Sequence, residues 1–131
     1  MKRKILFRGY NLKNKKWLYG YYLVNRGKHF IAEEGLQPPG MTWEDFEVDP
    51  ESVGQYVAKV GGKEIYEGDI VDVFEANSNL MCMDEADVKY DKNVSSFVVF
   101  DGCITTLVKT LNRIYNILGN EYEEKLKISN P

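Results

Sequence analysis

The segment from Val48 to Val73, VDPESVGQYVAKVGGKEIYEGDIVDV, constrains the fold of this chain more than any other part of the sequence. Turn-forming residues in it alternate with short runs of β-branched and aromatic side chains, which is the pattern of successive short strands. The segments on either side have the composition of strands that could pair with it. We therefore expect a fold built from short β-strands joined by tight turns.

Three turn signals divide this segment. Asp49-Pro50 predicts a turn or a short helical turn, because proline fixes its own φ and restricts the residue before it. Gly61-Gly62 lies between the β-prone runs 55–60 and 64–66 and predicts a hairpin, since a positive φ costs glycine little. Gly68 is expected at a bulge or a sharp turn before the next strand.

The N-terminal part of the chain predicts two more hairpins. The apolar run 4–7 and the aromatic run 17–24 flank a polar connection, and 29–32 follows the turn signal at 25–28. The run 17–24 is apolar at both odd and even positions, so we expect both of its faces to be covered.

The second half of the chain continues the pattern of short strands. Residues 75–87 carry polar turn formers and a run of acids, which predicts an excursion from the sheet. The runs 88–90 and 96–100 predict a third hairpin. Residues 109–118 are ambiguous between a helix and a strand, and we favour extended structure at 115–118.

Three shorter segments complete the prediction. Gly35, Pro38-Pro39 and Gly40 exclude a regular helix from 34–43 and predict a loop. Residues 46–48 predict a brief strand, and 121–128 predict a short C-terminal helix.

Together these patterns predict one mainly β domain over residues 1–131, without internal repeats or linkers. The most specific fold we expect is a small SH3-like barrel or pseudobarrel of short antiparallel strands, with N-terminal β-hairpins and a short C-terminal helix. The expected core consists of Ile5, Phe7, Trp17, Tyr19, Ile65, Ile70, Val71, Val73, Val98 and Ile117.

Three segments resemble those of the YopX family, small proteins encoded mostly by phages and prophages. They are LFRGYNLKNKKWLYG at 6–20, VDPESVGQY with GKEIYEGDIV at 48–71, and ILGNEYEE at 117–124. The connector at 58–62 is shorter than in the family's pattern. The resemblance implies a phage or prophage accessory protein, and it carries no catalytic residues to this chain because the family's members are largely uncharacterised.

The sequence favours a cytoplasmic protein of the host cell. No apolar run approaches the ~20 residues that span a bilayer, and no signal-peptide pattern follows the basic N-terminus. Cys82 and Cys103 lack the spacing of a zinc site. We expect them to be free thiols, with a disulfide between them as the alternative.

Catalytic and metal-binding patterns are weak in this sequence. Glu64, Glu67, Asp69 and Asp72 could hold Mg²⁺ if they converged, but solvated or turn-capping carboxylates are the favoured interpretation. His29, the single histidine, lacks a nucleophile motif beside it and is expected to be structural. We therefore expect no enzyme, no cofactor and no metal site.

The strongest functional indication is the basic and aromatic N-terminal segment. Through Ala32 the chain carries nine Lys or Arg residues and no acid, whereas the remainder carries eight basic and twenty acidic residues. Such a segment could dock on an acidic surface of its own chain, of a second copy, or of a phage or host protein. The candidate binding surface consists of Arg8, Lys15, Lys16, Trp17, Tyr19 and Tyr21.

Two binding functions remain open for this surface. We favour protein binding, with self-association into a homo-oligomer. The alternative is a nucleic-acid-binding module, because aromatic side chains beside cations can stack on bases. The sequence pI of about 5.2 counts against that alternative, since nucleic-acid-binding domains are usually basic.

Overall fold

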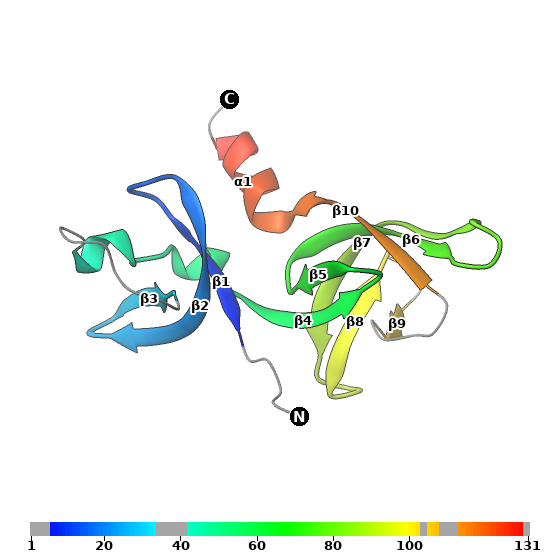
Figure 1. Ribbon diagram of the computed structural model, residues 1–131, viewed down its shortest axis with the longest axis horizontal. Coiled ribbons are helices and arrows are strands. Elements are labelled where there is room, and N and C mark those ends of the chain that lie inside the picture. Colours follow the sequence, from blue (N-terminus) through cyan, green and yellow to red (C-terminus); the bar gives the residue numbers. More distant parts are fainter. Residues whose placement is uncertain (1–5, 34–41, 103–104, 108–112, 130–131) are drawn as a thin grey trace. The chain divides into compact units, whose positions relative to one another are not determined.

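The protein is mainly β, as the sequence predicted. The computed structural model describes residues 6–33, 42–102, 105–107 and 113–129, which form antiparallel strands followed by one α-helix (Figure 1). The chain divides into two compact units, Met1–Tyr56 and Val57–Pro131. That the whole chain is a single domain therefore stays a prediction. Within the described ranges, no helix combines the length and the apolar character needed to cross a membrane.

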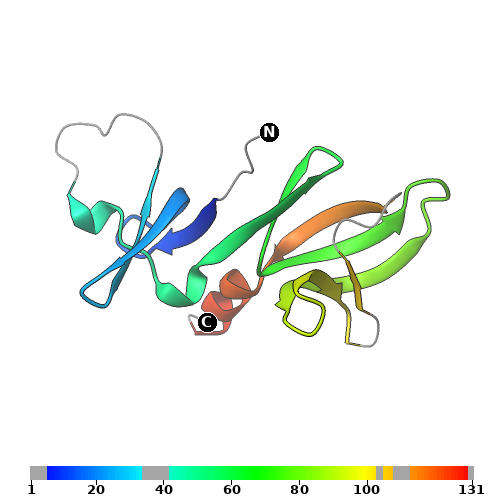
Figure 2. The same cartoon turned by 90° about the horizontal axis from the view of Figure 1, so that it is seen from below.

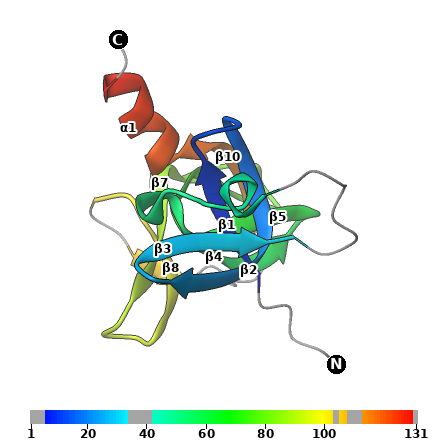
Figure 3. The same cartoon turned by 90° about the vertical axis from the view of Figure 1, so that its left-hand side faces the viewer.

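Unit 1 is an antiparallel sheet with two short 3-10 helices. Its strand order is β3-β2-β1-β4, and β2 lies beside β3 as Figure 3 shows. Both N-terminal hairpins predicted from the sequence are confirmed. The elements are β1 (Phe7–Asn11), β2 (Lys16–Asn25), β3 (Lys28–Ala32), η1 (Trp43–Asp45), η2 (Pro50–Ser52) and the first residues of β4 (Gly54–Val60).

Unit 2 begins within β4, which forms a hairpin with β5 (green in Figure 2). A second sheet with the order β10-β6-β7-β8-β9 follows, and then the helix. The elements are β5 (Lys63–Tyr66), β6 (Asp69–Glu75), β7 (Met81–Asp91), β8 (Ser96–Phe100), β9 (Thr105–Leu107), β10 (Arg113–Asn120) and α1 (Glu121–Ser129).

Neither sheet closes into a barrel within the described residues. In the second sheet β10 pairs only with β6 and β9 only with β8, so both remain edge strands. Closure would require the two edges to meet with a consistent tilt and stagger. The mainly β class, the hairpins and the short C-terminal helix are confirmed, while the described strands form open sheets where a barrel was expected.

The turn chemistry of residues 48–73 acts as predicted. Gly61 and Gly62 have φ values of 57° and 81°, and Gly68 has a φ of 95° in the turn between β5 and β6. Asp49 caps η2 by accepting the backbone N–H of Glu51 at 3.1 Å. These local conformations are readable from the sequence because few residue types tolerate them.

Each unit has its own apolar core. In unit 1 Leu18, Ile31 and Val48 are buried together. The larger core of unit 2 contains three of the six core residues predicted in this half of the chain, namely Ile65, Val71 and Val73. It is built on Ala58, Ile65, Val71, Val73, Met83, Ala86, Val88, Val99 and Tyr115.

The predicted core is correct in unit 2 except at one strand. Ile65, Val71, Val73 and Val98 are buried, and Ile70 is half-buried. Ile117 is 37% exposed, so its prediction as a core residue is wrong. The register of β10 against β6 shifts between Ile117 and Gly119, and this bulge ends the alternation that buries Tyr115.

The predicted core is less accurate in unit 1. Phe7 and Trp17 are half-buried, and Ile5 lies outside the described residues. Tyr19 is 45% exposed, which contradicts its prediction as a core residue. Tyr21 is exposed as well, so the expectation that both faces of 17–24 are covered is wrong. Strand alternation turns Leu18 inward and therefore turns its neighbours outward.

Residues 75–87 do not leave the sheet as predicted. After a short turn, Met81 begins the long strand β7, and the acids occupy its outward positions while Met83 and Ala86 are buried. Glu85 has a φ of 48°, and the pairing of β6 with β7 shifts register nearby. A bulge thus accommodates the polar run without ending the strand.

The remaining segment predictions have mixed outcomes. Extended structure at 115–118 is confirmed by β10, and 109–112 lie outside the described residues. The predicted loop at 34–43 lies mostly outside them too. The brief strand predicted at 46–48 is a single β-bridge between Glu47 and Phe30. Two backbone hydrogen bonds flank this bridge: the N–H of Ile31 donates to the carbonyl of Phe46, and the N–H of Val48 donates to the carbonyl of His29.

Replacement of Gly68 by valine is expected to destabilise the protein by ~1–3 kcal/mol, because a β-branched residue resists a φ of 95°. Urea denaturation measures this change. Gly61→Val should cost less, since its φ of 57° lies in the left-handed region that other residues enter at times. Equal losses at the two positions would contradict this ranking.

Gly20→Ala is expected to destabilise unit 1 by about 1–3 kcal/mol through overpacking. A Cβ atom on Gly20 would lie 2.2 Å from the carbonyl oxygen of Ala32, which belongs to the backbone of β3 and cannot move away cheaply. Gly119→Ala is the matched control, because a Cβ atom there would meet nothing within 4 Å. In urea denaturation, the free energy of unfolding should fall for the first variant and should change by less than about 0.5 kcal/mol for the second.

Candidate functional site

The outward side of β2 carries three aromatic residues in a row of alternate positions. Leu18 and Gly20 point into unit 1 and are buried, so Trp17, Tyr19 and Tyr21 share the opposite side of the strand. Tyr19 is 45% and Tyr21 is 55% exposed, and Trp17 is half-buried. We call these three residues the β2 aromatic face.

Arg8 pairs with Tyr19 in the register of β1 and β2, so its side chain lies on the same side of the sheet as this face. It is only 8% exposed, and its guanidinium carbon lies 4.9 Å from the centre of the Trp17 ring. Tyr10 meets the same ring edge-on, with 5.4 Å between ring centres. Arg8 therefore holds Trp17 in place and is not an exposed cation at this surface.

The two predicted surface lysines are exposed. Lys15 lies in the β1–β2 turn with a φ of 53°, and Lys16 is the first residue of β2. All six predicted residues thus belong to the β1–β2 hairpin. The structure presents Lys15, Lys16, Tyr19 and Tyr21 to solvent, half-buries Trp17 and buries Arg8.

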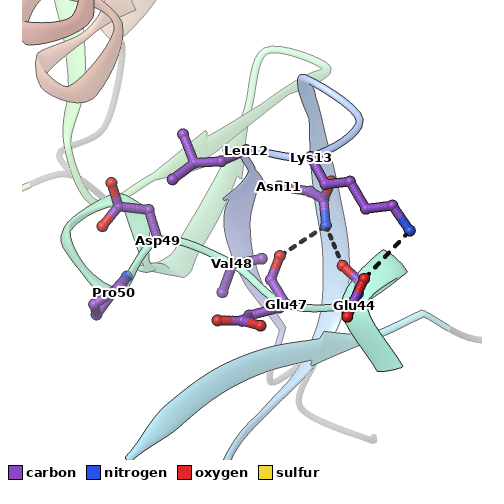
Figure 4. Close-up of a pocket in the computed structure, with 8 residues that line it drawn as sticks. All are labelled: Asn11, Leu12, Lys13, Glu44, Glu47, Val48, Asp49 and Pro50. Carbon is purple, nitrogen blue, oxygen red and sulfur yellow. Dashed lines mark hydrogen bonds and ion pairs between the residues drawn. The ribbon is translucent and has the colours of Figure 1, made fainter. Parts of the chain in front are cut away.

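A pocket that the sequence did not indicate lies at the end of the same hairpin (Figure 4). It encloses about 440 Å³, which is within the size range of ligand pockets in proteins. We call it the Asn11 pocket. Its lining consists of Asn11, Leu12, Lys13, Glu44, Glu47, Val48, Asp49 and Pro50.

The Asn11 side chain holds the two walls of this pocket together. It is 1% exposed, and its Nδ2 donates to the backbone carbonyls of Glu44 at 3.1 Å and Glu47 at 2.8 Å. Its Oδ1 accepts the backbone N–H of Asn14 at 2.6 Å. The backbone N–H of Asp49 also donates to the backbone carbonyl of Tyr10 at 2.9 Å, so the loop before η2 is fixed to the end of β1.

Charges are unevenly placed around the pocket. The Nζ atom of Lys13 lies 3.2 Å from Asp45 and 3.7 Å from Glu44, so the single lysine of the lining is already paired. The backbone N–H of Thr42 and the side chains of Asn14 and Lys13 hold the pKa of Asp45 well below its usual range. Glu47 and Asp49 carry the remaining acidic charge of the lining.

Sequence reasoning missed this pocket for a physical reason. Asn11 was predicted in a polar connection but is the last residue of β1, and the two carbonyls that its side chain binds lie more than thirty residues further along the chain. An asparagine between strands normally indicates a turn. Only the tertiary structure reveals that the amide is buried and joins two segments.

The family model described as YopX protein matches residues 6–127. The chain belongs to the YopX family. The match includes the three segments that carry the resemblance in the sequence, as well as the hairpin and the pocket described above. No curated protein and no solved structure shows significant similarity to this chain.

The four clustered carboxylates of this YopX-family protein have different surroundings. Asp69 is 2% exposed and accepts the backbone N–H of Tyr66 at 2.8 Å, so its predicted turn-capping role is confirmed. Asp72 accepts the N–H of Glu85 at 3.0 Å. Glu64 is exposed and Glu67 is half-buried. Across the described part of the chain, no three potential metal ligands come together.

The histidine and the described cysteine lie within the sheets. The Tyr22 hydroxyl is hydrogen-bonded to Nδ1 of His29, and the two rings stack with 5.7 Å between their centres. Cys82 is a free, half-buried thiol in β7, whereas Cys103 lies outside the described residues. The alternative of a disulfide between the two cysteines therefore stays untested.

Asp84→Asn is expected to stabilise the protein at neutral pH. The hydrogen bond that protonated Asp84 donates to the Asp72 carboxylate raises the pKa of Asp84, and burial and the negative charge of Asp72 act in the same direction. A raised pKa in the folded state stabilises the fold below the usual carboxyl range, and this contribution is lost as the pH rises through the raised value. Asparagine cannot lose a proton, so the variant keeps the stabilisation.

Urea denaturation at pH 4 and pH 7 tests this prediction. The stability gain of Asp84→Asn should be larger at pH 7 and should shrink toward zero at acidic pH. Glu75→Gln, which removes another exposed carboxylate of the β6–β7 hairpin, is the control for the loss of one charge. A gain that is independent of pH would contradict the raised pKa of Asp84 in the folded protein.

Proposed function

We propose that this YopX-family protein is a non-enzymatic phage or prophage accessory protein that binds protein, in the first place a second copy of itself. The observation that carries the proposal is the exposure of Tyr19 and Tyr21 on one side of β2. Exposed aromatic side chains on a rigid strand are frequent anchors of protein interfaces. Their backbone is fixed by pairing with β1 and β3.

The charge distribution supports self-association. The N-terminal 32 residues are basic and the rest of the chain is strongly acidic, so two copies carry complementary surfaces. Exposed ion pairs contribute only ~0–1 kcal/mol each and are screened by salt. Apolar contact of the β2 aromatic face would then supply most of the binding free energy.

The non-enzymatic part of the proposal is supported by the sequence. The chain has no recognisable nucleophile motif, phosphate-binding glycine loop or histidine-based metal motif. His29 is bonded to Tyr22, which suits a structural role. A cytoplasmic location in the host cell remains part of this proposal.

The double variant Tyr19→Ala with Tyr21→Ala is expected to lower the apparent mass toward the monomer mass of 15.1 kDa. Light scattering over a concentration series at low and high salt measures the effect. Urea denaturation of the same variant should show little change, because exposed side chains contribute little to folding. Unchanged assembly in this variant would contradict the proposal, as would a wild-type protein that is monomeric at all concentrations.

Two matched variants control this experiment. Val24→Ala removes a side chain that is 54% exposed on the same strand but lies on the opposite side, and it should not change the mass. Lys15→Ala with Lys16→Ala removes two exposed charges and should change the mass little. A large change of mass in either control variant would indicate that the interface lies outside the β2 aromatic face.

A nucleic-acid-binding module is the second candidate function. The observation that favours it is the position of exposed Lys15 and Lys16 at the start of the strand that carries Tyr19 and Tyr21. Titration with single-stranded DNA separates the two functions. Micromolar binding that falls steeply with salt and is lost in the double lysine variant would favour nucleic acid over protein.

A further inference from the structure

We propose that the Asn11 pocket binds the side chain of an arginine or lysine presented by a protein partner. The inference rests on the proposed function in that the ligand is part of a protein. It concerns a different surface from the β2 aromatic face, however, and it specifies the chemistry of the group that is recognised.

The pocket is preorganised before any partner arrives. The buried amide of Asn11 fixes the carbonyls of Glu44 and Glu47, and Ser52 accepts the N–H of Tyr10 at 2.7 Å on the adjoining turn. Thr42 and Asp45 form a capping box that fixes the start of η1. Binding therefore does not require these walls to be ordered, which lowers its entropic cost.

One part of the pocket is apolar. Val48 forms a buried wall with 3% of its surface exposed, and Leu12 is 56% exposed beside it. In Figure 4 Leu12, Asp49 and Pro50 lie on one side of Asn11, and Lys13 and Glu44 lie on the other. Arginine and lysine side chains have aliphatic stems that pack on such a surface while their heads stay polar.

The acidic charge of the pocket selects the cationic head. Lys13 is paired with Asp45 and Glu44, which leaves the Glu47 carboxylate to attract a ligand. Among the described residues, no cation lies in ion-pair contact with the Glu47 carboxylate. A carboxylate bonded to guanidinium or ammonium forms stronger hydrogen bonds than one bonded to a neutral donor.

An amphipathic side chain fits this lining better than a small free cation does. A free diamine would use the Glu47 carboxylate but would gain little from Leu12, Val48 and Pro50. A peptide would bring a stem and flanking backbone into about 440 Å³ of space. The structure therefore favours a basic side chain that belongs to a protein.

NMR titration of the full chain with short capped peptides tests the proposal. An acetylated and amidated Gly-Arg-Gly should cause saturable shifts of the Asn11 side-chain amide and of the Leu12 and Val48 methyl groups. The same peptide with citrulline, which is nearly isosteric and uncharged, should bind at least about tenfold more weakly. Putrescine should also bind more weakly than the arginine peptide.

Variants and an internal reference make the result decisive. Glu47→Gln should weaken peptide binding about threefold to tenfold, whereas Glu51→Gln, a nearby exposed carboxylate outside the lining, should not. A second acidic hollow lies in unit 2 and contains Glu85, Asp87, Leu118 and Glu124. NMR shifts of its Leu118 methyl groups during the titration measure how far charge alone attracts the peptide to an acidic surface.

Three results would overturn the proposal: equal shifts at Leu118 and at the Asn11 pocket, equal affinity of the citrulline peptide, or unchanged affinity in Glu47→Gln. Binding of putrescine as tightly as the peptide would overturn the protein partner in favour of a free cation. The titration is repeated with the Tyr19→Ala, Tyr21→Ala variant. If peptide binding persists there while wild-type self-association is not observed, the proposed function fails and the pocket inference stands.

Discussion

The hydrogen bonds of one buried amide connect the parts of unit 1 that regular sheet pairing leaves unconnected. Asn11 ends β1, and its side chain satisfies one carbonyl of η1, one carbonyl of the segment between η1 and η2, and the N–H of Asn14 in the β1–β2 turn. Buried backbone groups without partners are costly, so one side chain that satisfies three of them fixes the geometry around it. The pocket beside Asn11 exists because this segment is held at a defined position.

Strand β2 shows how one segment serves both the core and a surface. Leu18 is buried with Ile31 and Val48, and Gly20 allows the backbone of β3 to approach closely. The alternate residues of the same strand form the β2 aromatic face. Because the inward residues are fixed by packing, the tyrosines on the outward side are held on a rigid support.

Carboxylates in unit 2 show that residue type alone does not decide electrostatic behaviour. Asp69 is buried and accepts a backbone N–H, whereas Asp72 lies close enough to Asp84 to raise the pKa of that residue. Both aspartates belong to the same strand, three positions apart. Their different surroundings arise from the turn at Gly68 on one side and from the bulged pairing of β6 with β7 on the other.

The sequence by itself determined the features that depend on local backbone chemistry. The positive φ of Gly61, Gly62 and Gly68, the cap at Asp49 and the order of the hairpins follow from residue types that tolerate few alternatives. Family membership followed from the same segments. The six residues of the predicted binding surface lie on one hairpin, although burial of Arg8 was not foreseen.

Only the tertiary structure decided the features that depend on distant partners. The exposure of Tyr19 and Ile117, the continuation of β7 through an acidic run, and the open edges of the sheets all depend on which strand lies alongside. The Asn11 pocket is the clearest case, because its walls come from segments more than thirty residues apart. Local propensity specifies a turn at Asn11, but burial of its amide arises from packing that no local pattern encodes.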